Sequence, residues 1–333
     1  MDSLTQIVLG ASVGEAVLGK KVGNKAMLWG AVAGTIPDLD VLCRYVVDTV
    51  TAIEWHRGLS HSIFFSILAA PILGWVVWKL NKKEEASRKN WSLLMFWGLF
   101  THPLLDAFTT WGTQLFWPFK TRLAFQSIFV IDPLYTLPFL VFLILAMFQK
   151  RTSSKRRRYN RLGLILSSSY LMLTLILKGV AHSKFLKSLD EQEIAYTDID
   201  SRPTPFNSIL WAANVDTPNA YLVGSYSFFD SQEVRFSPYR KNHELLGELK
   251  DEDKVRRLIA ITEDWYTVSK QAGDIFLNDL RFGPLGFDTD APKFAFTYQL
   301  LQGEKGVQVK EVPNSKEDAK KMLPMLWNRI WGN

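Results

Sequence analysis

Residues 91–111, WSLLMFWGLFTHPLLDAFTTW, combine the two features that decide how this chain folds. The stretch is apolar over the length of a bilayer-spanning helix, which needs about 20 residues. It also contains His102 and Asp106, which lie four residues apart and therefore share one face of a helix. Ionisable side chains inside a membrane segment are costly and commonly functional. The stretch therefore predicts a membrane helix that carries part of a site.

Similar apolar stretches occur throughout the first half of the chain. Six are candidates for burial in a bilayer, at residues 4–18, 26–47, 62–78, 91–111, 127–148 and 162–177. The first and last are short for a span, and the first also contains Gly10, Gly14 and Glu15. It is expected to be a tilted span, a half-helix or a helix packed inside the bundle. Residues 1–189 are thus predicted to form an α-helical membrane bundle of about six membrane segments.

The charges of the chain divide between its two parts. Residues 1–189 carry 22 Lys and Arg against 10 Asp and Glu, whereas residues 190–333 carry 17 against 23. Fifteen basic residues lie on the connections after segments one, three and five, and four lie on the alternate connections. This asymmetry predicts a multi-pass membrane protein with residues 190–333 outside the cytoplasm. The Arg156–Arg158 run is interpreted as a solvated topology signal, and no nucleic-acid partner is expected.

The sequence changes in texture after residue 190. Residues 208–216 and 219–229 are rich in Trp, Val, Tyr and Phe and meet at Thr217-Pro218-Asn219, which predicts a β-hairpin. Further strands are expected at residues 276–282, 294–301 and 307–312, and helices at residues 251–268 and 315–330. The bundle is therefore predicted to be followed by a soluble α+β domain over residues 190–333.

Polar motifs interrupt or flank the apolar segments. The second segment is broken by TIPDLD at residues 35–40, where Pro37 disrupts helical hydrogen bonding beside Asp38 and Asp40. The third segment opens with WHRGLSHS at residues 55–62. Imidazole and carboxylate groups together suit zinc, iron or manganese. The single cysteine, Cys43, excludes a disulfide framework and a cysteine-rich zinc site.

The predicted topology brings these motifs to the outer side of the membrane. We therefore expect a divalent metal, zinc or manganese, to be surrounded by six residues: Asp38, Asp40, His56, His61, His102 and Asp106. Each motif also has an ordinary structural interpretation. An HxxxD pair can be held by hydrogen bonds, Pro-Asp-Leu-Asp can cap a helix break, and Glu15 is expected to be a structural partner inside the bundle.

Taken together, the motifs resemble the YdjM-like membrane-bound metal-dependent hydrolases. The resemblance covers about residues 1–180, in the opening MDSLT and in the GTIPDLD, HRGLSHS and HPLLD motifs, the last followed by TTWG. It implies an inner-membrane, metal-dependent hydrolase. A histidine often follows the opening threonine in this family, whereas this chain has Gln6, which can hydrogen-bond a ligand but is a poor metal ligand.

The leading functional hypothesis is a metal-dependent hydrolase at the outer membrane–water boundary. Asp38 or Asp40 would act as general base, and Arg57 and Arg122 would meet a phosphate unless they anchor lipid headgroups. Membrane lipids are the expected surroundings, and a phosphoester of a lipid or lipid-linked molecule is the expected substrate. The alternatives are a metal or ion permease, and a membrane anchor that carries a binding module.

Overall fold

The computed structural model describes residues 1–286, 292–303 and 306–333, and they form two compact units. The helical unit contains Met1–Leu42, Trp55–Ile176 and Pro205–Asn207. The sheet unit contains Cys43–Glu54, Leu177–Thr204 and the described part of Ser208–Asn333. The units therefore alternate along the chain, and each is described below by itself.

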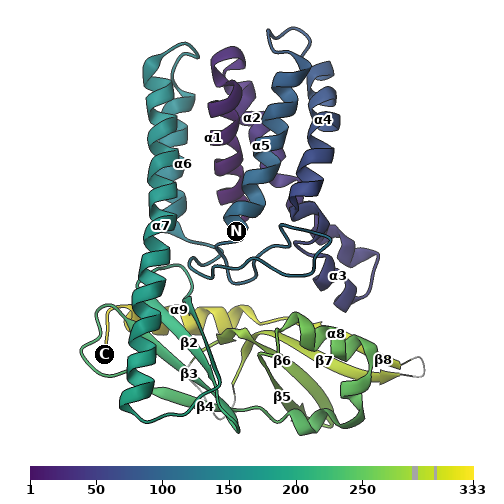
Figure 1. The fold of residues 1–333 in the computed structure, drawn as a ribbon, viewed down its shortest axis with the longest axis vertical. Helices are drawn as coiled ribbons and strands as arrows, with labels where there is room; N and C mark the ends of the chain where they lie inside the picture. The colour runs from purple at the N-terminus through teal and green to yellow at the C-terminus, as the bar shows by residue number, and fades with distance from the viewer. Residues whose placement is uncertain (287–291, 304–305) are drawn as a thin grey trace. The chain divides into compact units, whose positions relative to one another are not determined.

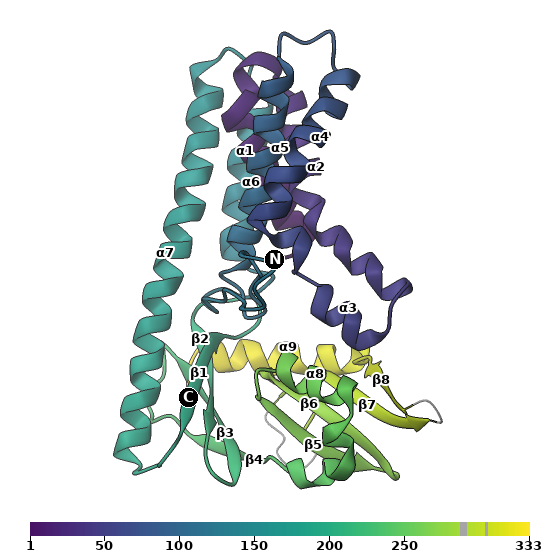
Figure 2. The same cartoon turned by 45° about the vertical axis from the view of Figure 1, so that its right-hand side comes forward.

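The helical unit is a bundle whose helices run alongside one another in Figures 1 and 2. Two short 3-10 helices interrupt the sequence of α-helices beside the candidate site. The elements are α1 (Ser3–Val22), α2 (Asn24–Thr35), η1 (Pro37–Tyr45), η2 (Leu59–His61), α4 (Ile63–Leu80), α5 (Arg88–Asp106), α6 (Pro133–Met147) and the first part of α7 (Ser154–Glu191).

Only some of these helices can cross a membrane by their own length and composition. Among the described residues, α4 and α7 are long and apolar enough. The pair of α2 and η1, which is bent by 43°, would be a third span if it is counted as one helix. The prediction of six membrane segments is not supported. The helix α6 has 15 residues, which is short for a span. Charged or polar side chains within α1 and α5, such as Glu15 and His102, are buried inside the bundle.

Glycines bring α1 and α2 into backbone contact. Gly10 and Gly14 on α1 face Gly30 and Gly34 on α2, and a methyl group on Gly10 or Gly30 would overlap the carbonyl oxygen of the other. Small residues four apart are typical of closely packed membrane helices. This contact matters for the site because it places the C-terminal end of α2 against the N-terminal turns of α1.

An ion pair is buried on the other side of α1. Glu15 accepts two hydrogen bonds of 2.6 Å from the guanidinium of Arg156 at the start of α7, and Nη1 of Arg156 donates to Asn24 Oδ1 at 2.8 Å. Glu15 is thus a structural partner, as expected. Arg156, expected to be solvated, is only 1% exposed, because its partner lies inside the bundle.

The sheet unit contains two antiparallel four-stranded sheets, whose strands are drawn as arrows in Figure 1. The predicted hairpin is confirmed: β2 and β3 pair antiparallel, with Leu210 opposite Ser227. The first sheet contains β1 (Asp198–Pro203), β2 (Leu210–Asp216), β3 (Ala220–Ser227) and β4 (Phe236–Arg240). The second contains β5 (Tyr266–Gln271), β6 (Asp274–Pro284), β7 (Phe294–Gly303) and β8 (Gly306–Val312).

Helices complete the sheet unit. They are η3 (His243–Asp251), α8 (Asp253–Ile261) and α9 (Lys316–Ile330). The helix expected over residues 251–268 is wrong in its second half. Glu263 and Asp264 have φ of 54° and 62°, which ends the helix, and the β-branched and aromatic residues that follow form β5.

A segment from the first half of the chain packs within the sheet unit. The helix α3 (Thr49–Trp55) buries Val50 completely in the same apolar core as Leu258 of α8. Arg257 of α8 donates to both carboxylate oxygens of Glu54, at 3.0 and 2.6 Å. The chain therefore leaves the helical unit after residue 42, is fixed on the sheet unit, and returns at Trp55.

The buried ion pair gives the first prediction. Replacing Glu15 with Gln leaves the Arg156 charge buried without its counterion, so we expect the bundle to lose about 3–5 kcal/mol of stability. Thermal unfolding of the full chain in detergent measures this loss. The matched control is Arg157→Gln, which changes the exposed neighbour of Arg156 and should leave the melting temperature unchanged. Equal melting temperatures for both variants would contradict a structural role for the pair.

Candidate metal centre

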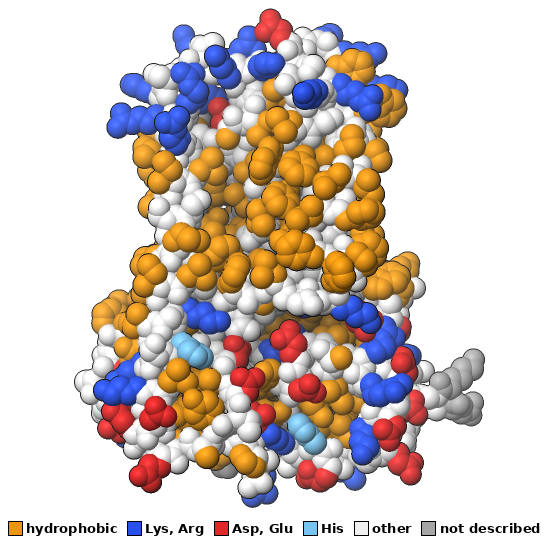
Figure 3. All heavy atoms as spheres, viewed as in Figure 1, with side chains coloured by type: hydrophobic (Ala, Val, Ile, Leu, Met, Phe, Trp, Pro, Cys, Tyr) orange, Lys and Arg blue, Asp and Glu red, His pale blue; other side chains and the backbone are white. Residues whose placement is uncertain are grey.

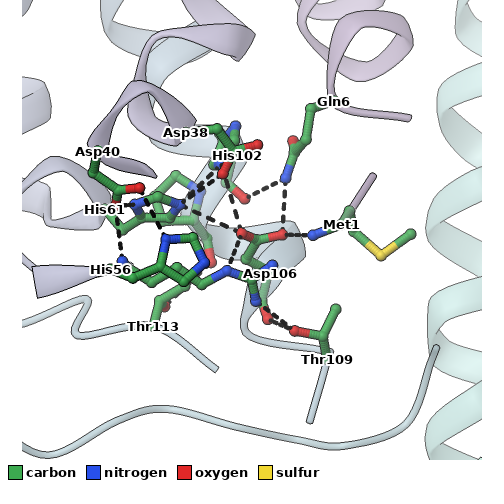
Figure 4. Close-up of polar contacts among 12 residues, drawn as sticks. Met1, Gln6, Asp38, Asp40, His56, His61, His102, Asp106, Thr109 and Thr113 are labelled. Atoms are coloured by element: carbon green, nitrogen blue, oxygen red, sulfur yellow. Dashed lines mark hydrogen bonds and ion pairs between the residues drawn. The ribbon is translucent and has the colours of Figure 1, made fainter. Parts of the chain in front are cut away.

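Four side chains from three elements converge at one point of the helical unit. Asp38 comes from η1, His61 from η2, and His102 and Asp106 from α5. One nitrogen or oxygen atom of each lies within 4.8 Å of the corresponding atom of every other. Figure 4 shows these groups pointing toward one another, with His61, His102 and Asp106 completely buried.

Local sequence explains how these side chains reach the point. Pro37 follows the last turn of α2, and the chain bends there by 43° into η1. The bend moves Asp38 away from the axis of α2. Ser62 accepts a hydrogen bond from the backbone N–H of Phe65 and so begins α4 immediately after His61. His102 and Asp106 share one face of α5 because they lie one turn apart.

The distances between the four atoms match a four-coordinate metal site. Nε2 of His61 lies 3.1 Å from Nε2 of His102 and 3.4 Å from Oδ1 of Asp38. The separations are 3.3 Å from His102 to Asp38, 3.5 Å from His61 to Asp106, and 3.6 Å from His102 to Asp106. Metal–ligand bonds of about 2.0–2.1 Å in a tetrahedron give ligand–ligand distances of about 3.3–3.4 Å. These separations are therefore close to those of a tetrahedral ligand set.

Hydrogen bonds on the far side of each imidazole point the ligand nitrogens inward. Nδ1 of His102 lies 2.6 Å from the carbonyl oxygen of Gly34, which can only accept a hydrogen bond. Nδ1 of His61 lies 3.3 Å from the Asp40 carboxylate and 3.0 Å from the Ser60 hydroxyl. With Nδ1 protonated in both rings, both Nε2 atoms present lone pairs to the same point, which is the arrangement of metal-binding histidines.

Asp106 supplies an oxygen with no hydrogen-bond donor. Its Oδ1 accepts hydrogen bonds from Gln6 Nε2 at 2.9 Å and from the amino group of Met1. Its Oδ2 is buried and accepts no hydrogen bond within the described structure, although Nε of Arg57 lies 3.1 Å away. A buried carboxylate oxygen left without a donor is costly, and a cation at the convergence point would satisfy it.

The site requires positive charge. Burial lowers the pKa of the His61 imidazole, but hydrogen bonds to the carboxylates of Asp106, Asp38 and Asp40 outweigh it and raise the pKa to about 9. At neutral pH the negative charge of the carboxylates therefore stabilises either a proton on His61 or another cation in its place.

Asp40 and His56, which were also predicted as ligands, lie beside these four. Oδ2 of Asp40 accepts from the backbone N–H of Arg57 at 2.8 Å, and its Oδ1 lies 2.9 Å from Nδ1 of His56. The side chain of His56 is 33% exposed, whereas those of His61 and His102 are completely buried. Asp40 thus joins the buried His61 to the water-accessible His56.

The two arginines singled out in the sequence have different surroundings. Arg57 is buried and donates from Nη1 to Thr109 Oγ1 at 2.8 Å. Arg122 donates from Nη2 to the backbone carbonyl of His56 at 3.1 Å, and its guanidinium lies 5.5 Å from the centre of the Trp111 ring. Arg122 therefore contacts residues next to the cluster, whereas Arg57 also pairs with Asp106 within it.

Sequence reasoning missed the Gly34 carbonyl and Thr109 as parts of this site. A backbone acceptor carries no side-chain signal, and the glycines at positions 30 and 34 were the available clue. Gln6 takes the role expected from its chemistry, since it donates to a ligand-type carboxylate.

The helical bundle and its cluster define a membrane protein with a group of Asp and His side chains that can hold a metal ion. The family model for the YdjM inner membrane protein matches residues 1–181, and the chain belongs to this family, as its motifs indicated. No curated protein matches the chain, and no solved structure matches it.

The electrostatics of the cluster predict how metal binding responds to pH. His61 holds a proton below about pH 9, so a divalent ion must displace it. We expect the apparent affinity for Zn²⁺ to rise by up to about tenfold per pH unit from pH 6 toward 9 and then level off. Calorimetry at pH 7 in buffers of different ionisation enthalpy should show about one proton released per ion.

The control for this titration is His243→Ala, a histidine of the sheet unit, which should keep the same pH dependence. The carboxylates of Asp38, Asp40 and Asp106 face His61, as does His102, while His56 reaches it through Asp40. An affinity independent of pH between 6 and 8 would contradict the assignment.

Proposed function

We propose that this protein is a membrane-bound metal-dependent hydrolase. The observation that carries the proposal is the convergence of two imidazole nitrogens and two carboxylate oxygens, beside a second Asp–His pair. Oδ2 of Asp106 lies 3.1 Å from Nε of Arg57 and 3.5 Å from Nε2 of His61 and accepts no well-directed hydrogen bond among the described residues, so it remains able to bind a cation.

Asp38, His61, His102 and Asp106 are the proposed ligands of a divalent ion. Two nitrogen and two oxygen ligands at tetrahedral spacing favour zinc over manganese, which prefers more oxygen ligands. When bound, such an ion would act as a Lewis acid and would lower the pKa of a water that it took as a fifth ligand. Asp40 fixes the orientation of His61, and the Gly34 carbonyl fixes that of His102.

His56 is the proposed general acid–base, and Asp40 is its positioning residue. The hydrogen bond to Asp40 occupies Nδ1 of His56 and leaves Nε2 to accept or donate a proton. This differs from the sequence hypothesis, in which Asp38 or Asp40 took the proton. Asp40 is less suited because both of its oxygens are engaged, by His56 and by the backbone of Arg57.

A phosphoester of a lipid or lipid-linked molecule is the proposed substrate. Arg57 and Arg122 supply guanidinium groups beside the cluster, which suit a phosphate. The loop over residues 112–126 contacts the His56 region and exposes Phe116 and Phe119, which are 60% and 72% exposed. Exposed aromatic rings beside a polar site suit a substrate with an apolar tail.

Transport is the second candidate function, and one observation favours it. The break between α2 and η1 puts Asp38 at a helix discontinuity, as in transporter ion sites. Proteoliposomes distinguish the two functions, since a permease moves the metal ion across the bilayer without consuming a phosphoester.

The ligand set gives a prediction with three variants. We expect wild-type protein to bind one divalent ion and to hydrolyse a chromogenic phosphodiester. His102→Ala and Asp106→Asn should both lose the ion and the activity, because each removes a ligand. His56→Ala should keep the ion and lose about 10²–10⁴-fold in kcat, because it removes the proton carrier and no ligand.

Metal analysis and kcat are measured on the same preparations, with His243→Ala as the control that should match wild type in both. Loss of the ion from His56→Ala would make His56 a ligand and overturn its assignment. Metal-free wild-type protein after gentle purification would overturn the proposed function itself.

We also propose that the sheet unit lies outside the cytoplasm. The support is the positive-inside rule: Lys and Arg gather at one end of the helical unit, at the connections α1–α2, α4–α5 and α6–α7 (Figure 3). A reporter active only in the cytoplasm should be silent when fused after Asn333. The same reporter inserted at residues 81–87, between α4 and α5, should be active. The reverse pattern would overturn the orientation.

A further inference from the structure

Helix α9 of the sheet unit presents an exposed apolar stripe. Leu323, Trp327 and Trp331 follow one another at intervals of four residues, so they lie along one side of the helix and its end. They are 46%, 61% and 55% exposed. Within the described part of the sheet unit, no other tryptophan is as exposed. The stripe is therefore an unusual concentration of apolar surface.

The C-terminal turn of the same helix is firmly attached to the rest of the sheet unit. Ile330 is buried, and Arg329 donates to both carboxylate oxygens of Asp230, at 2.5 and 2.6 Å. Trp331 stacks on the exposed ring of Phe229, with centroids 5.5 Å apart and planes 18° from parallel. Because these contacts fix the helix, the exposed stripe is a presented surface and does not arise from a frayed end.

Two segments of the chain tether the sheet unit to the helical unit. Helix α7 continues without a break from the helical unit into the sheet unit, where Phe185 packs with Trp211. Its 38 residues extend about 57 Å, which is longer than a hydrocarbon core of about 30 Å. The segment Cys43–Glu54 adds a second attachment, since both of its ends continue into the helical unit.

We propose that α9 binds the surface of a phospholipid bilayer through Leu323, Trp327 and Trp331. Tryptophan is enriched at the membrane interface, and an amphipathic helix buries its apolar side at the boundary of headgroups and acyl chains. Lys320 is exposed one turn before Leu323, where its ammonium suits a lipid phosphate. Phe229 extends the apolar stripe beyond the helix. This interaction is independent of the metal centre.

Site-directed spin labels test the proposal on the full chain. Cys43 is the only cysteine, so Cys43→Ser supplies a background for Trp327→Cys and Trp331→Cys. Lys270→Cys is the matched control, because Lys270 is an exposed residue of β5 in the same unit. Each labelled protein is placed in nanodiscs of phosphatidylcholine and phosphatidylglycerol, one chain per disc, and its collisions with oxygen and with a water-soluble nickel chelate are compared.

The expected result is a change of sign in the logarithm of the oxygen-to-nickel collision ratio. It should be positive at positions 327 and 331, where the label lies in lipid, and negative at position 270. A negative value at all three positions would overturn the proposal by showing α9 in water. Low collision with both reagents at 327 and 331 would also overturn it, because protein from this chain or a partner would then cover the stripe.

Discussion

Four ligand-type atoms are held together at one buried point, and the surrounding structure is arranged around that constraint. Two imidazole nitrogens 3.1 Å apart and two carboxylate oxygens lie together, and a positive charge among them, a proton or a metal ion, would stabilise the group. The raised pKa of His61 expresses the same requirement, since a proton is the smallest cation that can meet it. A metal ion meets it for all four groups together.

The helical unit meets this constraint through backbone features as much as through side chains. The glycine contact between α1 and α2 brings the Gly34 carbonyl to His102 and Gln6 to Asp106. The break at Pro37 then frees Asp38 to turn toward α5. The buried ion pair of Glu15 and Arg156 holds the other part of α1 to α7, so the helix that supplies Gln6 is fixed at two places.

The sheet unit has a structural connection to the site through the chain itself. The residues that join Asp40 to His56 include Cys43–Glu54, which packs on α8 through Val50 and the ion pair of Glu54 with Arg257. Fixing this segment limits how far the two motifs can move apart.

The sequence already determined the class of protein, the His and Asp motifs and much of the sheet unit, because apolar length, charge asymmetry and strand periodicity are local properties. The hairpin of β2 and β3 was predicted on this basis and is found. Only the structure set the helix lengths, and with them which helices are long and apolar enough to span a membrane. It also paired charges such as Glu15 inside the bundle. It also decided that Asp40 and His56 lie beside the four converging groups. Which groups converge depends on distances and on imidazole tautomers, and the tautomer of His102 is set by Gly34, a residue far from it in the chain.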